Sequence, residues 1–354
     1  MIRLRHTITL AAIATSVALL AACAPAPDPT AETDVVDYCA RMVTNSGGLE
    51  DRCFNQSSWE GLQQAADQYG IDVDAIVSTA ETDLAPNVTQ AVATGCDLIL
   101  TVGFELADAT LAQAEANPDV HFAIVDEQVD ADNVKPIVFD TAQAAYLAGY
   151  LAAGVSRTGT VATFGGGNQP PVTLFMDGFV DGVAAYNAAH AADVRVLGWD
   201  KAAQDGLFTG DFEDINKGKS YASGLIDQGA DVIMPVAGQV GEGAAAAAVE
   251  VDGVSIIWVD NDGYDTLPAE FRPVLLTSVL KNTQQAVVDL VGLDTAGTFT
   301  NSPFVGTLDN GGVDIAPFHD QADRVPAVLA AEIDALRAAI VAGTLTVTSP
   351  STPK

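Results

Sequence analysis

Short apolar runs alternate with longer amphipathic stretches along most of the chain after residue 37. The apolar runs have the length of buried strands, and strands are predicted around 41–44, 75–78, 98–102, 122–125, 160–164, 194–198, 232–236 and 256–259. The stretches between them have helical length, for example 58–69, 107–116, 142–155, 172–186, 217–228 and 243–249. Because this alternation is typical of parallel strands joined by crossover helices, the pattern predicts an α/β fold.

The same pattern occurs twice along the chain. The first strand ends in Asn45-Ser46-Gly47-Gly48, the strand that opens the second half ends in Gly165-Gly166-Gly167-Asn168, and a helix follows each. Each half is therefore predicted to be a doubly wound parallel-sheet lobe that binds ligand at the carboxyl ends of its strands. Two such lobes that face each other form a cleft.

The last part of the chain indicates that the lobes are not simply joined end to end. After residue 259 come an apolar run at 274–280, a helix, a Gly-rich segment at 306–312 and a final helix around 328–342. This surplus predicts several chain crossings and therefore a hinged cleft. We expect lobe 1 to contain 37–139 and about 263–305, and lobe 2 to contain 140–262 and about 306–345.

The first residues have the pattern of a secretory signal. Arg3 and Arg5 precede an apolar run at 7–20, which is short for a membrane span. The run ends in Leu20-Ala21-Ala22-Cys23, which resembles the lipobox of bacterial lipoproteins, where small residues precede a cysteine that receives lipid. The alternative is an ordinary signal with an incidental cysteine, because such signals also end in small residues.

We expect residues 1–22 to be a lipoprotein signal peptide and lipidated Cys23 to begin the mature chain. Residues 23–36 are rich in proline and offer no core face, so they are predicted to form a flexible tether. The protein is then expected at the extracytoplasmic face of the cell membrane, which it contacts through the lipid anchor only.

Composition excludes one class of partner. The 354 residues include 47 Asp and Glu but only 15 Lys and Arg, which gives a formal net charge of -32. Such a charge repels a phosphate backbone and anionic lipid headgroups, so no nucleic-acid partner is expected.

Three cysteines follow Cys23 in a compartment that permits disulfides. Cys39 opens the first predicted strand and Cys96 opens the third, and these two strands are neighbours in a doubly wound sheet. We therefore favour a Cys39–Cys96 disulfide, with Cys53 free.

Signatures of catalysis and of cofactors are incomplete. Gly218-Lys219-Ser220 looks like the end of a phosphate-binding loop, but Glu213 stands where the required glycine should be. The glycines of 238–243 do not have the dinucleotide-binding spacing. No cofactor and no enzymatic activity are expected.

No metal site is expected either. The histidines after the signal are far apart in the sequence and have no cysteine at ligand spacing; they are His121, His190 and His319.

The most informative stretch is 42–61, Met-Val-Thr-Asn-Ser-Gly-Gly-Leu-Glu-Asp-Arg-Cys-Phe-Asn-Gln-Ser-Ser-Trp-Glu-Gly. It reads as a strand, a polar turn, a loop that contains an aromatic residue, and a helix. This order places Phe54 and Asn55 near the ligand edge.

The stretch resembles the basic membrane protein family of substrate-binding lipoproteins, also called the purine nucleoside receptor family, which supply ABC importers. Family members carry Thr-Asp-x-Gly-Gly-x-x-Asp-x-Ser-Phe-Asn-Gln followed by Trp-x-Gly here. Further matches follow in family order at 95–104, 121–126, 145–153, 165–166, 170–172, 177–179, 229–233, 259–262, 277–282 and 306–313.

This resemblance implies a type I periplasmic-binding fold that holds a nucleoside, first of all a purine nucleoside, between its lobes. It also implies that aromatic rings sandwich the base while a carboxylate and a lysine bind the ribose hydroxyls, an arrangement that suits both groups. Phe54 matches the first stacking position. Phe212 matches the second, with Phe208 as its competitor. The other matched or neighbouring candidates are Asp260 and Lys281 for the ribose, Gly238 for a backbone contact, Asp126 for a polar contact, and Asn45, Ser46 and Asn55 in the first loop.

Several candidates have a plainer alternative. Phe54 could be a core aromatic, and Asn55 could cap the following helix. Asp260 and Lys281 could form a structural ion pair across the hinge. Asn45 stands where the family usually has Asp, so if this position reads a purine edge, an amide that also donates could change base preference.

The sequence thus predicts a lipoprotein that captures a nucleoside between two lobes and delivers it to an ABC transporter permease. The alternative function is a ligand sensor or surface protein that binds a nucleoside or another small polar molecule without transport.

Overall fold

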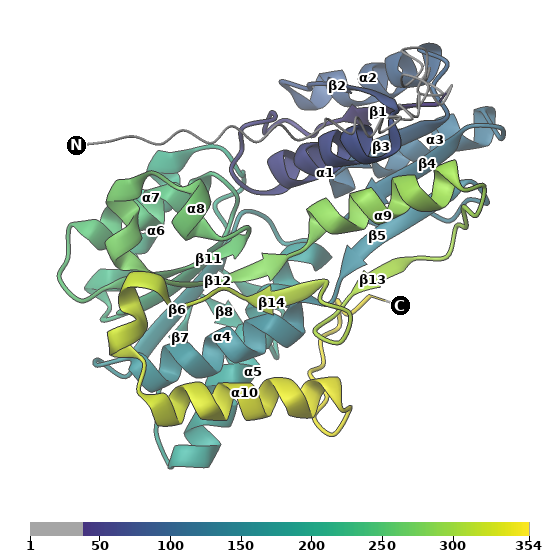
Figure 1. Ribbon diagram of the computed structural model, residues 1–354. Coiled ribbons are helices and arrows are strands. Elements are labelled where there is room, and N and C mark those ends of the chain that lie inside the picture. Colours follow the sequence, from purple (N-terminus) through teal and green to yellow (C-terminus); the bar gives the residue numbers. More distant parts are fainter. Residues whose placement is uncertain (1–37, 354) are drawn as a thin grey trace, which may run out of the picture. The chain divides into compact units, whose positions relative to one another are not determined.

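The computed structural model describes residues 38–353, all of which lie within the unit Val36–Lys354. The predicted signal peptide, the whole predicted tether and the lipidation candidate Cys23 lie outside the described residues. Strands and helices alternate as the hydrophobic pattern predicts (Figure 1). Within 38–353, no helix combines the length and the apolar character that a membrane span requires.

The first lobe is built on a six-stranded sheet in which all neighbouring strands are parallel, in the order β13-β5-β4-β3-β1-β2. Its central strands are buried on both faces because helices cover both sides of the sheet. The strands are β1 (Cys39–Val43), β2 (Asp72–Ile76), β3 (Leu98–Val102), β4 (His121–Val125), β5 (Val134–Phe139) and β13 (Phe304–Gly306).

The second lobe repeats this architecture in a sheet with the order β14-β12-β11-β10-β6-β7. Its neighbours are parallel except β14, which runs antiparallel to β12. The strands are β6 (Thr160–Gly165), β7 (Arg195–Leu197), β10 (Val232–Val236), β11 (Ser255–Asp260), β12 (Leu275–Lys281) and β14 (Val313–Ile315); β8 (Trp199–Asp200) and β9 (Asp205–Gly206) form a separate hairpin. The predicted pair of doubly wound lobes is confirmed.

The helices pack in pairs on the two sheets, with α1 against α9 in the first lobe and α4 against α5 and α6 against α7 in the second. Their bounds are α1 (Phe54–Tyr69), α2 (Glu81–Ala93), α3 (Ala107–Ala116), α4 (Thr141–Val155), α5 (Pro170–His190), α6 (Ile215–Asp227), α7 (Val240–Val249), α8 (Gly263–Thr266), α9 (Thr283–Thr295) and α10 (Ala327–Val341). Short 3₁₀ helices cover Phe104–Leu106, Ala269–Val274 and His319–Arg324.

One expected lobe boundary is wrong. The segment 263–281 was expected in lobe 1, but its strand β12 pairs with β11 of the second sheet, with Trp258 opposite Ser278. The chain enters the first lobe only after Lys281, where α9 packs on α1. An apolar strand pattern does not reveal which sheet the strand joins, whereas β12 completes the hydrogen bonding of β11, which would otherwise be an edge.

The chain crosses between the lobes after β5, after β12 and after β13, and the crossing segments are hydrogen-bonded to one another. The Asp140 N–H donates to the Gly306 carbonyl at 2.8 Å, and the Asn282 N–H donates to the Gly312 carbonyl at 2.9 Å. Gly306 and Gly312 approach so closely that a Cβ on Gly312 would lie 2.3 Å from the Gly306 Cα. Glycine is required here because no side chain fits between the crossing strands.

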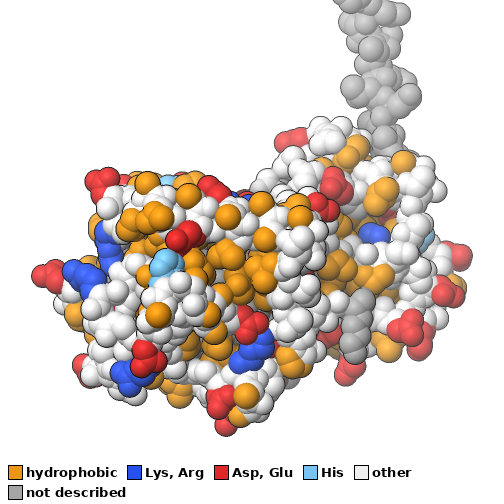
Figure 2. Space-filling model, turned by 90° about the horizontal axis from the view of Figure 1, so that it is seen from below, with side chains coloured by type: hydrophobic (Ala, Val, Ile, Leu, Met, Phe, Trp, Pro, Cys, Tyr) orange, Lys and Arg blue, Asp and Glu red, His pale blue; other side chains and the backbone are white. Residues whose placement is uncertain are grey.

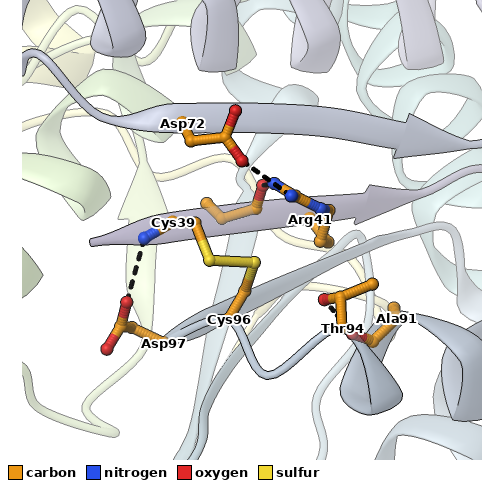
Figure 3. Close-up of a disulfide and its surroundings, with 8 residues drawn as sticks. Cys39, Arg41, Asp72, Ala91, Thr94, Cys96 and Asp97 are labelled. Carbon is orange, nitrogen blue, oxygen red and sulfur yellow. Dashed lines mark hydrogen bonds and ion pairs between the residues drawn. A yellow bond between two sulfur atoms is a disulfide. The ribbon is translucent and has the colours of Figure 1, made fainter. Parts of the chain in front are cut away.

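The predicted disulfide between Cys39 and Cys96 is present (Figure 3). It joins the start of β1 to the residues just before β3, with a Cα–Cα distance of 4.9 Å, and the Cys39 N–H also donates to Asp97 at 2.9 Å. Cys53 is buried and is the free cysteine among residues 38–353. The bond therefore fixes two neighbouring strands at the edge opposite their carboxyl ends.

The disulfide is expected to stabilise the first lobe by constraining the unfolded chain. For a sequence separation of 57 residues, the loop-entropy relation gives a loss of about 4 kcal/mol in the free energy of unfolding when the bond is absent. Chemical denaturation of the Cys39→Ala/Cys96→Ala variant, compared with the wild type under non-reducing conditions, measures this loss. Wild type in reductant is the control. Equal denaturation midpoints in all three samples would contradict the prediction.

Candidate ligand-binding site

A cavity of about 600 Å³ lies between the two lobes at the carboxyl ends of their strands. The first lobe lines it with the loops after β1, β3 and β4, and the second lobe with the loops after β6 and β10 and with the ends of β11 and β12. This is the edge at which doubly wound sheets bind ligands. Outside it, acidic side chains are scattered over the face seen in Figure 2, where basic side chains are few.

Eight of the nine candidate residues line this cavity: Asn45, Ser46, Phe54, Asp126, Phe212, Gly238, Asp260 and Lys281. Asn55 does not line it. Asn55 is fully buried behind the loop, where its side-chain Nδ2 donates to Asn45 Oδ1 at 2.7 Å. It positions Asn45, and it does not face the cavity.

Asn55 does not cap α1 either. Asp51 fills that role, because its carboxylate accepts hydrogen bonds from the backbone N–H groups of Cys53, Asn55 and Gln56 at 3.1, 2.8 and 3.0 Å. Burial raises the pKa of Asp51, and these three N–H groups oppose that rise. The loop from 45 to 54 is thereby held in one conformation that presents Phe54 at the start of the helix.

A buried lysine joins two carboxylates at one side of the cavity. Lys281 Nζ, at the end of β12, donates to Asp126 Oδ2, and it lies 3.4 Å from Asp260 Oδ1. The three side chains are 4%, 9% and 15% exposed in the order Lys281, Asp126, Asp260. Asp126 comes from the first lobe, so the contact crosses the cleft, whereas Asp260 and Lys281 are on neighbouring strands of the second sheet.

This triad is electrostatically constrained. Burial would lower the pKa of Lys281, but the charges of Asp126 and Asp260 outweigh burial and raise it, so the lysine stays protonated. Burial raises the pKa of Asp126, with Lys281 opposing. Asp260 Oδ1 is buried and makes no hydrogen bond within the described chain. Asp126 and Asp260 both have a left-handed backbone, with φ of 64° and 69°, a strained conformation for a non-glycine residue that often marks functional sites.

Aromatic rings from both lobes enter the same cavity. Lys281 Nζ lies 5.4 Å from the centroid of the Phe54 ring. The ring of Phe212 lies over Gly166, where a Cβ would come within 2.3 Å of it. The competing Phe208 also lines the cavity, but it contacts Trp199 edge to face at 5.8 Å and so has a packing role as well. Phe212 therefore remains the first candidate for the second stacking position, with Phe208 as its competitor.

The cleft is closed by direct contacts between the lobes. Asn261 Nδ2 donates to the Cys53 carbonyl at 2.8 Å, and Arg52 forms an ion pair with Glu242 at 3.0 Å. Gln239 reaches the Gly47 carbonyl at 3.4 Å. All three contacts join the β1–α1 loop of the first lobe to the ligand edge of the second.

Phe175 and Glu105 are among the cavity-lining residues that sequence reasoning missed. Phe175 lies on α5, with its ring centroid 5.2 Å from Lys281 Nζ. Glu105 lies three residues after β3 and also lines the cavity. Burial raises the pKa of its carboxyl, whereas its own backbone N–H and the Asn45 amide lower it, and burial has the larger effect. The signal for Glu105 was its place at the carboxyl end of a strand; Phe175 had no comparable signal. Across 38–353, no cluster of His, Cys, Asp and Glu has the arrangement of a metal site.

Solved structures define the class of protein. An ABC transporter solute-binding protein from Aeropyrum pernix K1 is similar with a TM-score of 0.77 and 23% identity, over 88% of this chain and 94% of that one. A solute-binding protein from Conexibacter woesei DSM 14684 gives a TM-score of 0.68 and 26% identity over 88% and 99%. The fold is thus of the type I periplasmic-binding-protein kind, as expected.

Sequence comparison identifies the family. Residues 40–316 match the family described as ABC transporter substrate-binding protein PnrA-like, also called Bmp. The chain is 32% identical to the ABC transporter nucleoside-binding protein BmpA of Lactococcus lactis subsp. cremoris, over 98% of this chain and 99% of the relative. It is 35% identical to a CD4+ T-cell-stimulating antigen of Listeria monocytogenes over 74% and 75%. The chain belongs to this basic membrane protein family, whose members are substrate-binding proteins of ABC transporters and not enzymes.

Removing the lysine of the triad should strongly destabilise the protein. In Lys281→Met the two carboxylates lose their shared cation, and breaking a buried ion pair in this way costs about 3–5 kcal/mol. The loss should grow as pH rises above about 4, because a carboxyl with a raised pKa in the folded state disfavours folding once it ionises. Denaturation of variant and wild type across pH 4–8 measures both effects.

A matched control distinguishes this effect from the loss of any lysine. Lys219 pairs with Glu250 on the surface, where both side chains are well exposed, so Lys219→Met should change stability by less than about 1 kcal/mol. Adding Asp126→Asn to Lys281→Met should recover part of the loss. If the two lysine variants were equally stable, the triad would not hold the lobes as described.

Proposed function

We propose that this protein captures a nucleoside, first of all a purine nucleoside, between its two lobes and delivers it to the permease of an ABC importer. The observation that carries the proposal is that the Asp126–Lys281–Asp260 triad and the rings of Phe54 and Phe212 line one cavity between the lobes. An apolar slot next to a charged polar end matches a flat base joined to a ribose. The name of the Lactococcus relative, a nucleoside-binding protein, supports the same ligand class.

The ribose is proposed to bind at the triad. Vicinal hydroxyls can donate to a carboxylate and accept from an ammonium group, and Asp260 Oδ1 is a buried acceptor that no described group hydrogen-bonds. Lys281 Nζ lies 3.4 Å from this oxygen as an ion-pair partner, and a ribose hydroxyl that donates to it would add the hydrogen bond that it lacks. Asp126 anchors Lys281 from the first lobe, so the ribose would be bound where the two lobes meet.

The base is proposed to lie between Phe54 of the first lobe and Phe212 of the second. Each ring offers a flat apolar face, and stacking of a base on an aromatic ring contributes about 1–3 kcal/mol. Because the two rings belong to different lobes, the sandwich is complete only in the closed cleft. Ligand binding would therefore favour closure, and the permease would distinguish the loaded protein by its closed form.

Direct titration tests the ligand class. Calorimetry of the purified protein with adenosine, guanosine, inosine, uridine and cytidine should give tight binding of at least one purine nucleoside. Phe54→Ala and Asp260→Ala should each weaken binding by about 10- to 100-fold, since each removes one stacking or charged hydrogen-bonding partner. Phe299→Ala is the matched control, because this ring stacks on His121 at the opposite, amino end of β4. Unchanged affinity in both site variants would refute the assignment.

We also propose that Cys23 carries the lipid that holds the protein at the extracytoplasmic face of the cell membrane. Cys23→Ala should move the protein from the membrane fraction to the soluble fraction, because one residue supplies the only expected anchor. Fractionation and immunoblotting measure the distribution, and uptake of labelled nucleoside by the same cells tests delivery to a permease. Protein that stays with the membrane in the variant would contradict lipidation at Cys23.

A further inference from the structure

We propose that Glu105 is the residue that reads the edge of the base and that, together with Asn45, it makes guanosine the preferred nucleoside. The inference rests on the proposed function, since it assumes that a nucleoside occupies the cavity. Glu105 lies in the 3₁₀ turn after β3 and lines the cavity. Asn45 lies in the loop after β1, the strand next to β3.

Glu105 and Asn45 meet over one glycine. A Cβ placed on Gly103 would lie 2.6 Å from Glu105 Oε2 and 3.3 Å from Asn45 Nδ2. Gly103 has a φ of 115°, a conformation that side-chain-bearing residues rarely adopt. Only glycine therefore lets the two polar groups come together at this point of the cavity wall.

The hydrogen-bonding direction of Asn45 is fixed by its neighbours. Asn45 Oδ1 accepts from the Gly47 N–H at 3.2 Å and from Asn55 Nδ2 at 2.7 Å. A backbone N–H can only donate, so the amide oxygen must face Gly47 and the Nδ2 group is left as a donor at Gly103. An aspartate, which the family usually has here, would offer no donor at all.

One oxygen of the Glu105 carboxylate lacks a hydrogen-bond partner. This atom, Oε2, is buried and makes no hydrogen bond within the described part of the protein. A buried acceptor left in this state is costly, and an N–H group on the ligand would remove that cost. The cavity wall thus presents one donor, Asn45 Nδ2, beside one carboxylate acceptor.

Guanine matches this pair better than the other common bases. Its O6 accepts from Asn45, while its N1–H and 2-amino groups are adjacent donors for the two oxygens of a carboxylate. Hypoxanthine lacks the 2-amino donor. Adenine offers a single exocyclic amino group and an acceptor at N1, so it would leave the carboxylate with fewer hydrogen bonds. Sites with buried groups built to hydrogen-bond a ligand discriminate strongly against analogues that lack the matching group.

The test is titration of the purified protein and of Glu105→Gln with guanosine, inosine and adenosine. Wild type should bind guanosine about 10-fold or more tightly than either of the others, as one charged hydrogen bond implies. Glu105→Gln should weaken guanosine binding by at least about 10-fold and change adenosine binding little. Glu115→Gln, the same substitution on the exposed face of α3, is the matched control and should behave as wild type.

A second variant tests the donor. Asn45→Asp removes Nδ2 and places a second carboxylate beside Glu105, so it should also reduce the preference for guanosine. Adenosine binding that remains in either variant shows that the protein is folded. Tighter binding of adenosine than of guanosine by wild type, or an equal loss for all three ligands in Glu105→Gln, would overturn the role of Glu105 while leaving the proposed function intact. Failure of every nucleoside to bind wild type would overturn both.

Discussion

A buried lysine shared by two aspartates holds the closed form of this protein together. Lys281 cannot be buried at low cost without its partners, because removing a charge from water is repaid only by nearby opposite charges. One partner, Asp126, comes from the first lobe, and the other, Asp260, comes from the neighbouring strand of the second. The ion triad therefore couples three things: closure of the lobes, the shape of the cavity and the polar end of the proposed ligand site.

The two lobes are related by more than their fold. β4 and β11 occupy the same third position in the two sheet orders, and an aspartate with a left-handed backbone stands at the carboxyl end of each. A backbone in this conformation turns sharply out of the strand, which brings Asp126 and Asp260 together at the cleft from opposite sides. The duplicated architecture thus supplies two equivalent carboxylates, and the second lobe adds the lysine between them.

Most of the candidate residues were predicted because short motifs at strand ends resemble those of the family. Eight of the nine candidates line the cavity. The exception, Asn55, shows the limit of that reasoning, because a motif does not tell which of two adjacent residues points inward and which supports it. Strand β5 was not predicted from the hydrophobic pattern, since Lys135 and Pro136 interrupt it. In the folded protein Lys135 Nζ is satisfied by the carbonyl of Ser302 at 2.6 Å, a contact with a segment more than 160 residues away.

The sequence by itself determined the alternation of strands and helices, the two-lobed α/β architecture and the family, because periodicity and short motifs are properties of neighbouring residues. The alternation also implied that the first and third strands are neighbours in the sheet, and this favoured the pairing of Cys39 with Cys96. The tertiary structure alone decided that β12 belongs to the second sheet, that Lys281 bonds to Asp126 across a separation of 155 residues, and that Glu105 meets Asn45 over Gly103. These outcomes depend on which segments, far apart in the sequence, come into contact. Burial and charge pairing at such contacts arise only when the chain has folded.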